Sequence, residues 1–407
     1  MRIDRLAAWA PLGFLLAACG APRPSAEQLE RARALTQRAI VVDGHIDVPY
    51  RLQEKWEDVG IRTEGGDFDY PRAKEGGLDA PFMSIYTPAE LEEKGESYAL
   101  ANKLIDDVER IAREHPSKFE LARTAADVRR IAGTGKIAFL LGMENGSPVQ
   151  GELTNVDHFF RRGIRYITLC HGKDNHLCDS SYDQRHTHGG LSGFGKQVVE
   201  RMNRLGILVD VSHLNDDSIR DVLAVSKAPV FASHSSCRKF TPEWERNVTD
   251  DQIRAIAAKG GIVMINFGSA FIREDVRKRS EVAYAHLEQW QKEKGLRGDE
   301  PQAREYARRY LASHSPGFAD VRDVADHVEH VIALAGVEAV GFGSDFDGVG
   351  DSLPVRLKDV SQYPELVAEL LRRGHSEADL EKIVGGNALR VLEAVERRAA
   401  ELQAARN

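Results

Sequence analysis

Histidine, aspartate and glutamate residues stand directly after several apolar segments of this 407-residue chain. His45 and Asp47 are two residues apart, and because side chains alternate along an extended backbone, both can point toward one shared ion. Taken alone, such a pair is more often a buried histidine hydrogen-bonded to a nearby acid. The same residue types follow other apolar segments, namely Glu144, His171, His213, His234 and Asp345.

Two of these histidines, His213 and His234, repeat one pattern in which an apolar segment is followed by Ser and then His. Each alone fits a capping or core histidine, and Glu144 alone fits a salt bridge or an acid at a helix N-terminus. Together with His45 and Asp47 they supply three imidazoles and two carboxylates, which is enough for two zinc ions if one carboxylate is shared. We therefore predict a metal site built from these five residues.

Glu144 is the predicted bridge between the two ions, because it has two carboxylate oxygens and lies in sequence between the first ligand pair and the later histidines. Many other two-metal barrels use a carboxylated lysine in this place. No predicted strand ends on a suitable lysine, since Lys136 precedes its strand and Lys173 lies beyond His171 in a loop.

Short β-branched apolar segments, each followed by a longer amphipathic stretch, must position these residues. This alternation is typical of parallel strands with crossover helices, and eight strands close a TIM barrel, in which the strand ends converge on one mouth. The predicted strands are residues 39–43, 80–86, 137–141, 165–170, 206–211, 229–233, 261–267 and 339–343, and helix candidates include 97–114, 195–205, 216–225 and 250–258.

The predicted fold class is α/β, a (β/α)8 TIM-type barrel with a helical insertion at the charged segment 273–309. One barrel domain over residues 30–400 accounts for the chain, because single barrels with insertions reach this length. Acidic residues number 63 against 55 Lys and Arg, for a formal charge of -8. Without a basic block, nucleic acid is not an expected partner.

The first residues predict a lipoprotein signal peptide over residues 1–18, because two arginines precede an apolar run too short to span a bilayer. The segment Leu16-Ala17-Ala18-Cys19 resembles a bacterial lipobox, which predicts cleavage before Cys19 and a lipid on its thiol. The alternative is a plain secretory signal with an incidental cysteine. Residues 19–29 are the predicted tether. Gly20 favours the outer membrane, so we expect an exported, lipid-anchored protein on the periplasmic side.

Export to an oxidising compartment permits disulfides. Cys170 and Cys178 are close enough in sequence to bridge, which would leave Cys237 as the odd thiol. Sequence spacing does not fix the Cα geometry of a bridge, so this pairing stays open.

Several longer motifs resemble the membrane dipeptidases of the renal dipeptidase type, within the amidohydrolase-like metallohydrolases. The resemblance runs from about residue 30 to residue 397, and the loop 171–178 and the segment 273–309 depart from it. The matching motifs are DGHIDVPY (43–50), GLSGFG (190–195), NRLGILVD (203–210), SHSS (233–236), RNV (246–248) and GFGSDFDG (341–348).

The resemblance implies a binuclear zinc site with His45 and Asp47 on one ion, His213 and His234 on the other, and Glu144 shared. The implied reaction is hydrolysis of dipeptides by a hydroxide that bridges the two zinc ions. It also suggests broad specificity, including dipeptides with a D-residue at the C-terminal position. We add a homodimer as a possible assembly.

Three further residues take substrate-side roles by the same resemblance. His171 is similar to the family's substrate-side histidine and would stabilise the tetrahedral oxyanion. Arg246 is similar to its carboxylate-binding arginine, the alternative being a surface arginine in a charged run. Asp345 is similar to the acid beside the reacting amide and would move the proton, the alternative being a carboxylate that orients the histidine ligands. Asp347, two residues later, is predicted to be structural.

Two other functions are alternatives to dipeptide hydrolysis. Another binuclear zinc amidohydrolase would act on a cyclic amide or an ester, but Arg246 argues against it because such substrates lack a free carboxylate at that place. A lipoprotein that binds peptides or metal without turnover would have little use for Asp345.

Overall fold

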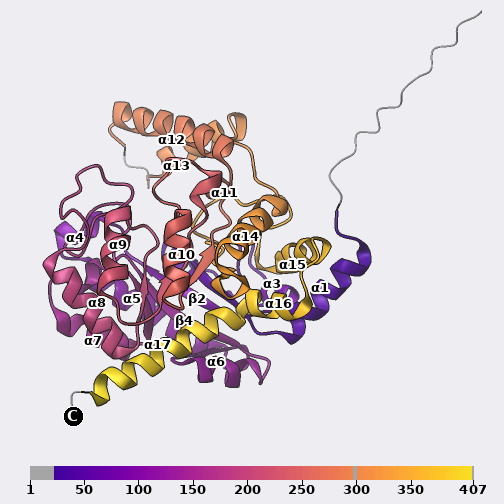
Figure 1. Ribbon diagram of the computed structural model, residues 1–407. Coiled ribbons are helices and arrows are strands. Elements are labelled where there is room, and N and C mark those ends of the chain that lie inside the picture. Colours follow the sequence, from indigo (N-terminus) through magenta and orange to yellow (C-terminus); the bar gives the residue numbers. More distant parts are fainter. Residues whose placement is uncertain (1–22, 297–299, 406–407) are drawn as a thin grey trace, which may run out of the picture.

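Short apolar strands pair side by side into a closed parallel barrel in the computed structural model, which describes residues 23–296 and 300–405 (Figure 1). Consecutive strands of the ring are hydrogen-bonded neighbours, and the last strand returns to the first. The ring runs β1 (Val41–Ile46), β2 (Leu78–Tyr86), β4 (Ile137–Glu144), β5 (Ile164–Thr168), β6 (Leu208–Asp210), β7 (Val230–Ala232), β8 (Ile262–Ile265) and β9 (Val340–Phe342). The predicted TIM-type barrel is confirmed.

The ring strands coincide with the eight predicted segments, although their ends differ. β1 continues to Ile46 and β4 to Glu144, so His45 and Glu144 lie within strands rather than after them. One strand was not predicted, β3 (Phe119–Leu121), which pairs with β4 outside the ring. Its three residues are too few to show an alternating pattern.

Helices cover the outside of the barrel, as crossover connections between parallel strands require. Three predicted helices have the predicted bounds, and the fourth begins two residues early because Ser192 caps it. The helices are α1 (Ala26–Arg38), α2 (Val48–Glu54), α3 (Tyr70–Gly76), α4 (Glu90–Lys94), α5 (Ser97–Glu114), α6 (Ala125–Ala132), α7 (Leu153–Arg162), α8 (Gly193–Leu205), α9 (Asp216–Val225), α10 (Asp250–Ala258), α11 (Ser269–Ile272), α12 (Glu274–Lys294), α13 (Pro301–Ser313), α14 (Val321–Ala335), α15 (Tyr363–Arg372), α16 (Glu377–Glu381) and α17 (Asn387–Ala404).

The predicted insertion is the helix pair α12 and α13, which lies at one end of the barrel in Figure 1. It continues four residues beyond the predicted end, to Ser313. The rings of Trp290 and Tyr306 stack with centroids 3.9 Å apart, and those of His286 and Tyr310 with centroids 4.2 Å apart. Aromatic stacking therefore joins the two helices.

The predicted tether is too long. α1 begins at Ala26, after Ser25 and Gln28 form a reciprocal capping box, and its residues Ala32 and Leu35 are fully buried. The folded part therefore begins before residue 30. The predicted signal peptide and Cys19 lie outside the described residues.

Cys170, Cys178 and Cys237 are buried free thiols, so within the described residues the possible bridge between the first two does not form. In the same part of the chain, no helix is both long and apolar enough to cross a membrane.

Aromatic side chains pack inside the barrel beneath the strand ends. The rings of Phe82 and Tyr166 have centroids 5.2 Å apart, and those of Tyr166 and Phe231 are 5.7 Å apart. Gly142 makes room for this packing, because a Cβ there would lie 2.0 Å from the Tyr166 ring. The polar residues at the strand ends therefore rest on a packed support.

Candidate metal centre

The structure brings the predicted ligands together around Glu144, the last residue of β4. One oxygen, Oε1, lies 3.1 Å from His213 Nε2 and 3.3 Å from His234 Nε2. The other, Oε2, lies 3.5 Å from His45 Nε2, which is in turn 3.2 Å from Asp47 Oδ2. The two oxygens of one carboxylate thus face the two ligand pairs that the sequence analysis separated.

The contacts among these groups fit metal ions. His213 Nε2 and His234 Nε2 are only 2.9 Å apart, and Asp47 Oδ1 is buried without a hydrogen-bond partner among the described residues. Three sets of ligand atoms are close enough to hold an ion: His45, His234 and Asp345; Glu144, His171 and His213; and His45, Asp47 and Glu144.

Protonation states agree with this fit. Burial, together with nearby positive charges, holds the pKa of His213 and His234 well below the usual value, so both are neutral, as metal ligation requires. Burial opposes the charged form of His45, but Tyr166 and the carboxylates of Glu144 and Asp47 raise its pKa well above the usual value. A metal ion bound to His45 would have to displace this proton, because a ligating imidazole is neutral.

Hydroxyl groups orient two of the imidazoles. Tyr166 Oη lies 2.6 Å from His45 Nδ1, and Ser233 Oγ lies 2.6 Å from His234 Nδ1 while donating to Asp210 Oδ2 at 2.6 Å. Because Nδ1 is engaged, Nε2 of each histidine is presented to the site. Tyr166, Ser233 and Asp210 were not among the predicted site residues. Only Ser233 had a signal, as the serine of the repeated Ser-His pattern.

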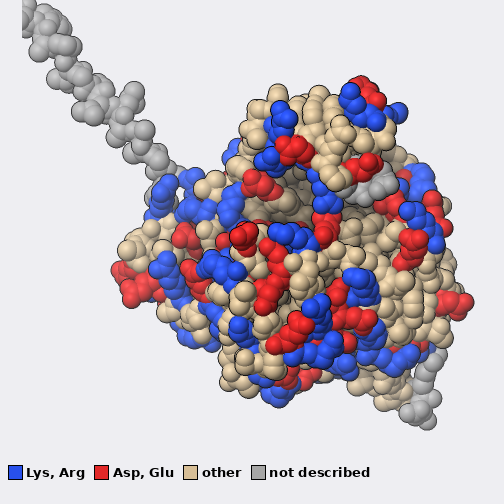
Figure 2. All heavy atoms as spheres, turned by 180° about the vertical axis from the view of Figure 1, so that it is seen from behind, with Lys and Arg blue, Asp and Glu red and all other residues tan. Residues whose placement is uncertain are grey.

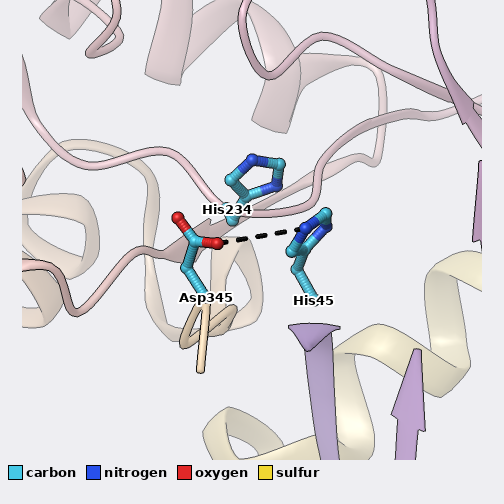
Figure 3. A group of neighbouring side chains, drawn as sticks. All are labelled: His45, His234 and Asp345. Atoms are coloured by element: carbon cyan, nitrogen blue, oxygen red, sulfur yellow. Dashed lines mark ion pairs between the residues drawn. The ribbon is translucent and has the colours of Figure 1, made fainter. Parts of the chain in front are cut away.

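Asp345 points into the same cluster from the loop after β9, as Figure 3 shows with His45 and His234. Its Oδ1 lies 4.0 Å from His45 Nε2, and its Oδ2 accepts a hydrogen bond of 2.7 Å from Asn266 Nδ2. Burial, with the neighbouring carboxylates, raises its pKa to about 7. An acid with such a pKa is suited to accept and release a proton near neutral pH.

The backbone at the site is strained in a way that functional sites often show. His213 and Asp345 have positive φ angles of 70° and 63°, which are uncommon for residues other than glycine. Gly348 packs between two acids, since a Cβ there would lie 2.2 Å from Asp47 Oδ2 and 2.3 Å from Asp345 Oδ1. A larger residue would displace both carboxylates.

Asp347 has the contacts of a structural residue. Its Oδ1 accepts from the Asp67 backbone N–H at 2.7 Å, and Asp67 Oδ2 accepts from the Asp347 N–H at 2.8 Å. Its Oδ2 lies 3.2 Å from Arg51 Nε. These contacts tie the loop after β9 to the segment before α3.

Arg246 is buried beside the cluster, with only 2% of its surface exposed, so the alternative of a surface arginine is wrong. Its Nη1 donates to Ser235 Oγ at 3.0 Å, and its Nη2 donates to the His234 carbonyl at 2.9 Å. Nη2 also lies 3.1 Å from His213 Nε2. These contacts fix the guanidinium next to the ligand cluster.

His171 stands on the open side of the cluster, with about a quarter of its side chain exposed. Its Nε2 lies 3.7 Å from Glu144 Oε1, and its ring is 4.2 Å from the His213 ring. Burial lowers its pKa, so it is neutral near pH 7. A neutral imidazole in this place can donate one hydrogen bond to a bound substrate.

A cavity of about 660 Å³ opens over these residues. Its polar wall contains the predicted ligands and acids, and its apolar wall is aromatic. The polar lining residues include Asp47, Glu144, His171, His213 and Asp345, and the aromatic ones include Tyr86, Tyr182, Phe271 and Tyr284. A cavity of this size suits a small polar substrate.

A parallel barrel with buried carboxylates and neutral imidazoles at the mouth of such a cavity defines the class of metal-dependent hydrolases. The family model for membrane dipeptidase (peptidase family M19) matches residues 29–406, and the chain belongs to this family.

Known relatives agree with this assignment. The chain is 34% identical to dipeptidase ataJ from Aspergillus terreus, over 92% of this chain and 89% of that protein. The probable dipeptidase PvdM from Pseudomonas aeruginosa is similar in structure, with a TM-score of 0.78, 27% identity and coverage of 91% of this chain and 99% of that one. A metallopeptidase from Rhodobacter sphaeroides, solved with a phosphinate mimic of the dipeptide L-Ala-D-Ala, has a TM-score of 0.72, 26% identity and coverage of 88% and 99%. The protein is therefore a metal-dependent dipeptidase.

The raised pKa of Asp345 predicts a stability effect in the metal-free protein. Asp345→Asn should raise the Tm at pH 8, because the folded state holds an ionised carboxylate there at a cost that the neutral amide avoids. The gain should shrink as the pH falls from about 7, the pKa in the folded protein, toward about 4, the ordinary value for Asp. Calorimetry after chelation of metal measures it.

The matched control is Asp351→Asn, whose side chain is 91% exposed and whose Tm difference should be small at every pH. A gain for Asp345→Asn that stays constant from pH 8 to pH 4 would contradict the raised pKa.

Proposed function

We propose that the protein hydrolyses dipeptides with two zinc ions bound per chain, and that it accepts a D-residue at the C-terminal position. One observation carries the two-ion site: the oxygens of Glu144 face His45 on one side and the pair His213 and His234 on the other. The D-residue is supported by the relative solved with a mimic of L-Ala-D-Ala.

Zinc is the metal that this ligand set favours, because imidazole nitrogens and carboxylate oxygens are its usual ligands together with thiolates. His45 and Asp47 would hold one ion, His213 and His234 the other, and Glu144 would bind both. Ions held in this way would activate a water molecule as the nucleophile near neutral pH and would polarise the scissile carbonyl, since metal binding lowers the pKa of water to about 7.

The protein's own groups then have distinct tasks. Asp345, held by the hydrogen bond from Asn266, takes up the proton of the nucleophile and delivers it to the leaving amine. His171 donates a hydrogen bond to the oxygen on which negative charge develops. Arg246 binds the free C-terminal carboxylate of the substrate with its planar guanidinium. This last task sets the orientation of the dipeptide in the cavity.

A panel of stereoisomers tests the proposal. Purified protein with measured zinc should contain two ions per chain and hydrolyse L-Ala-L-Ala and L-Ala-D-Ala, while D-Ala-L-Ala should be a poor substrate. Cleavage is measured by release of free alanine. Zinc-loaded protein that cleaves none of the three dipeptides, or that prefers a cyclic amide, would refute the proposed function.

We further propose that the mature protein is anchored to a bacterial membrane through a lipid on Cys19, in the sequence Leu16-Ala17-Ala18-Cys19. Cys19→Ser should abolish lipid attachment and move the protein from the membrane fraction to the soluble fraction. Immunoblots of fractionated cells measure this. A Cys19→Ser protein that still partitions with membranes as the parent does would refute the anchor. The homodimer stays a prediction.

A further inference from the structure

The insertion formed by α12 and α13 forms part of the cavity wall. Ser280 and Tyr284 of α12 line the same cavity as Glu144 and Asp345. They are four residues apart and thus neighbours on one face of the helix. Figure 2 shows the surface hollowed below the lobe that the insertion forms. The helix pair therefore covers part of the mouth.

The insertion contacts two segments that carry residues of the site, the loop with Trp244 and Arg246 and the helix α2 that follows Asp47. At the beginning of α12, the Arg277 guanidinium lies 5.9 Å from the centre of the Trp244 ring, two residues before Arg246 in sequence. On α13, Arg304 Nη2 lies 3.0 Å from Glu54 Oε1 at the end of α2, the helix that begins directly after Asp47. The stacked rings described above hold the two helices together.

The Arg246 guanidinium lies 5.1 Å from the centre of the Phe271 ring in α11, which leads directly into α12, so the beginning of α12 is the end nearer Arg246. Seven residues separate Tyr284 from Arg277, which corresponds to about 10 Å along a helix. Consecutive Cα atoms of a dipeptide are about 3.8 Å apart. If the substrate's carboxylate is bound by Arg246 and the dipeptide extends along α12, its N-terminal residue lies in the part of the cavity that Tyr284 lines.

We propose that Tyr284, with Ser280 beside it, is a specificity-determining residue that contacts the side chain of the dipeptide's N-terminal residue. This inference rests on the proposed binding of the C-terminal carboxylate by Arg246. Tyr284 is 51% exposed, so its ring offers a face that a large apolar side chain can cover. A cavity of about 660 Å³ has room for such a side chain, so Tyr284 attracts it rather than excluding it.

The test is a pair of substrate series with the variant Tyr284→Ala. In the first series, Phe-Ala is compared with Gly-Ala. The ratio of their kcat/KM values should fall about tenfold in the variant, or about 1.4 kcal/mol, because the apolar contact with the Tyr284 ring is lost. In the second series, Ala-Phe is compared with Ala-Gly, and this ratio should stay the same. Tyr284→Phe should keep the parent's ratios, since the ring is retained.

Val282→Ala is the matched control, because Val282 is on the same helix and is 71% exposed without lining the cavity. Metal content and Tm of every variant should equal those of the parent. Unchanged ratios in Tyr284→Ala, or a change only in the second series, would overturn the inference while the dipeptidase stands. A parent that cleaves none of these dipeptides would overturn both the proposed function and the inference.

Discussion

Replacing Glu144 with Gln should lower kcat/KM for dipeptides by at least about a thousandfold, or about 4 kcal/mol. The variant keeps the size of the side chain but removes the negative charge. The neutral amide can no longer offer two charged oxygens, one toward His45 and one toward the pair His213 and His234. Zinc content should fall with activity, which elemental analysis and steady-state kinetics measure together.

Two other variants test whether the loss of activity and zinc is specific to the proposed ligands. Glu152→Gln removes a carboxylate from an exposed position at the start of α7 and should leave both quantities unchanged. His213→Ala should abolish activity and lower bound metal, because His213 is proposed to hold one ion directly. Normal turnover in Glu144→Gln would place the shared carboxylate elsewhere, and two zinc ions retained in His213→Ala would remove that residue from the ligand set.

Replacing Arg246 with Met should cut kcat/KM for free dipeptides by on the order of 2 to 5 kcal/mol, since one partner of a buried charge pair is lost. Zinc content and fold should be preserved, because Met fills a similar volume and Arg246 is not a proposed ligand. Dipeptide amides, which lack the carboxylate, should be poor substrates of the parent and lose little further in the variant. The measurement compares parent and variant on acid and amide substrates.

Arg246→Lys separates the effect of the positive charge from that of the paired hydrogen bonds. Lys keeps the charge but cannot form two parallel hydrogen bonds with a carboxylate, so its activity on dipeptides should lie between those of the parent and Arg246→Met. If acid and amide substrates lose activity in equal proportion, Arg246 does not recognise the carboxylate. The proposed orientation of the dipeptide would then be wrong.

The sequence was sufficient to predict the barrel and the residues at its mouth, because both depend on local patterns. Apolar segments identify buried strands, and a polar residue such as His234 directly after one is conspicuous. The prediction that Glu144 is shared by two ions also came from sequence order, since Glu144 is the acid between the two ligand pairs. The structure brings these residues together, and their roles as ligands stay predictions.

Other parts of the site depend on contacts between distant residues, which no local pattern reveals. In the sequence, Tyr166 looks like any other buried strand residue. In the structure, its hydroxyl is hydrogen-bonded to His45, 121 positions earlier in the chain. Arg246 stands in a charged run typical of a surface, and only family resemblance indicated its role. The start of α1 is different, because the spacing of Ser25 and Gln28 is a capping signal that could have corrected the predicted tether.

The seam, where β1 and β9 pair and close the ring, has a consequence for how the molecule folds. There, the Asp345 N–H donates to the His45 carbonyl at 3.0 Å, and the Ser344 N–H donates to Asp43 Oδ1 at 3.0 Å across 301 positions of sequence. Closing so long a loop is entropically costly and slow, so we expect this seam to form late in folding. A nascent chain that lacks β9 has its ligand residues but no closed ring to hold them. Catalytic competence should therefore arise only after the whole barrel has been synthesised, and excess zinc should then stabilise the completed ring by mass action.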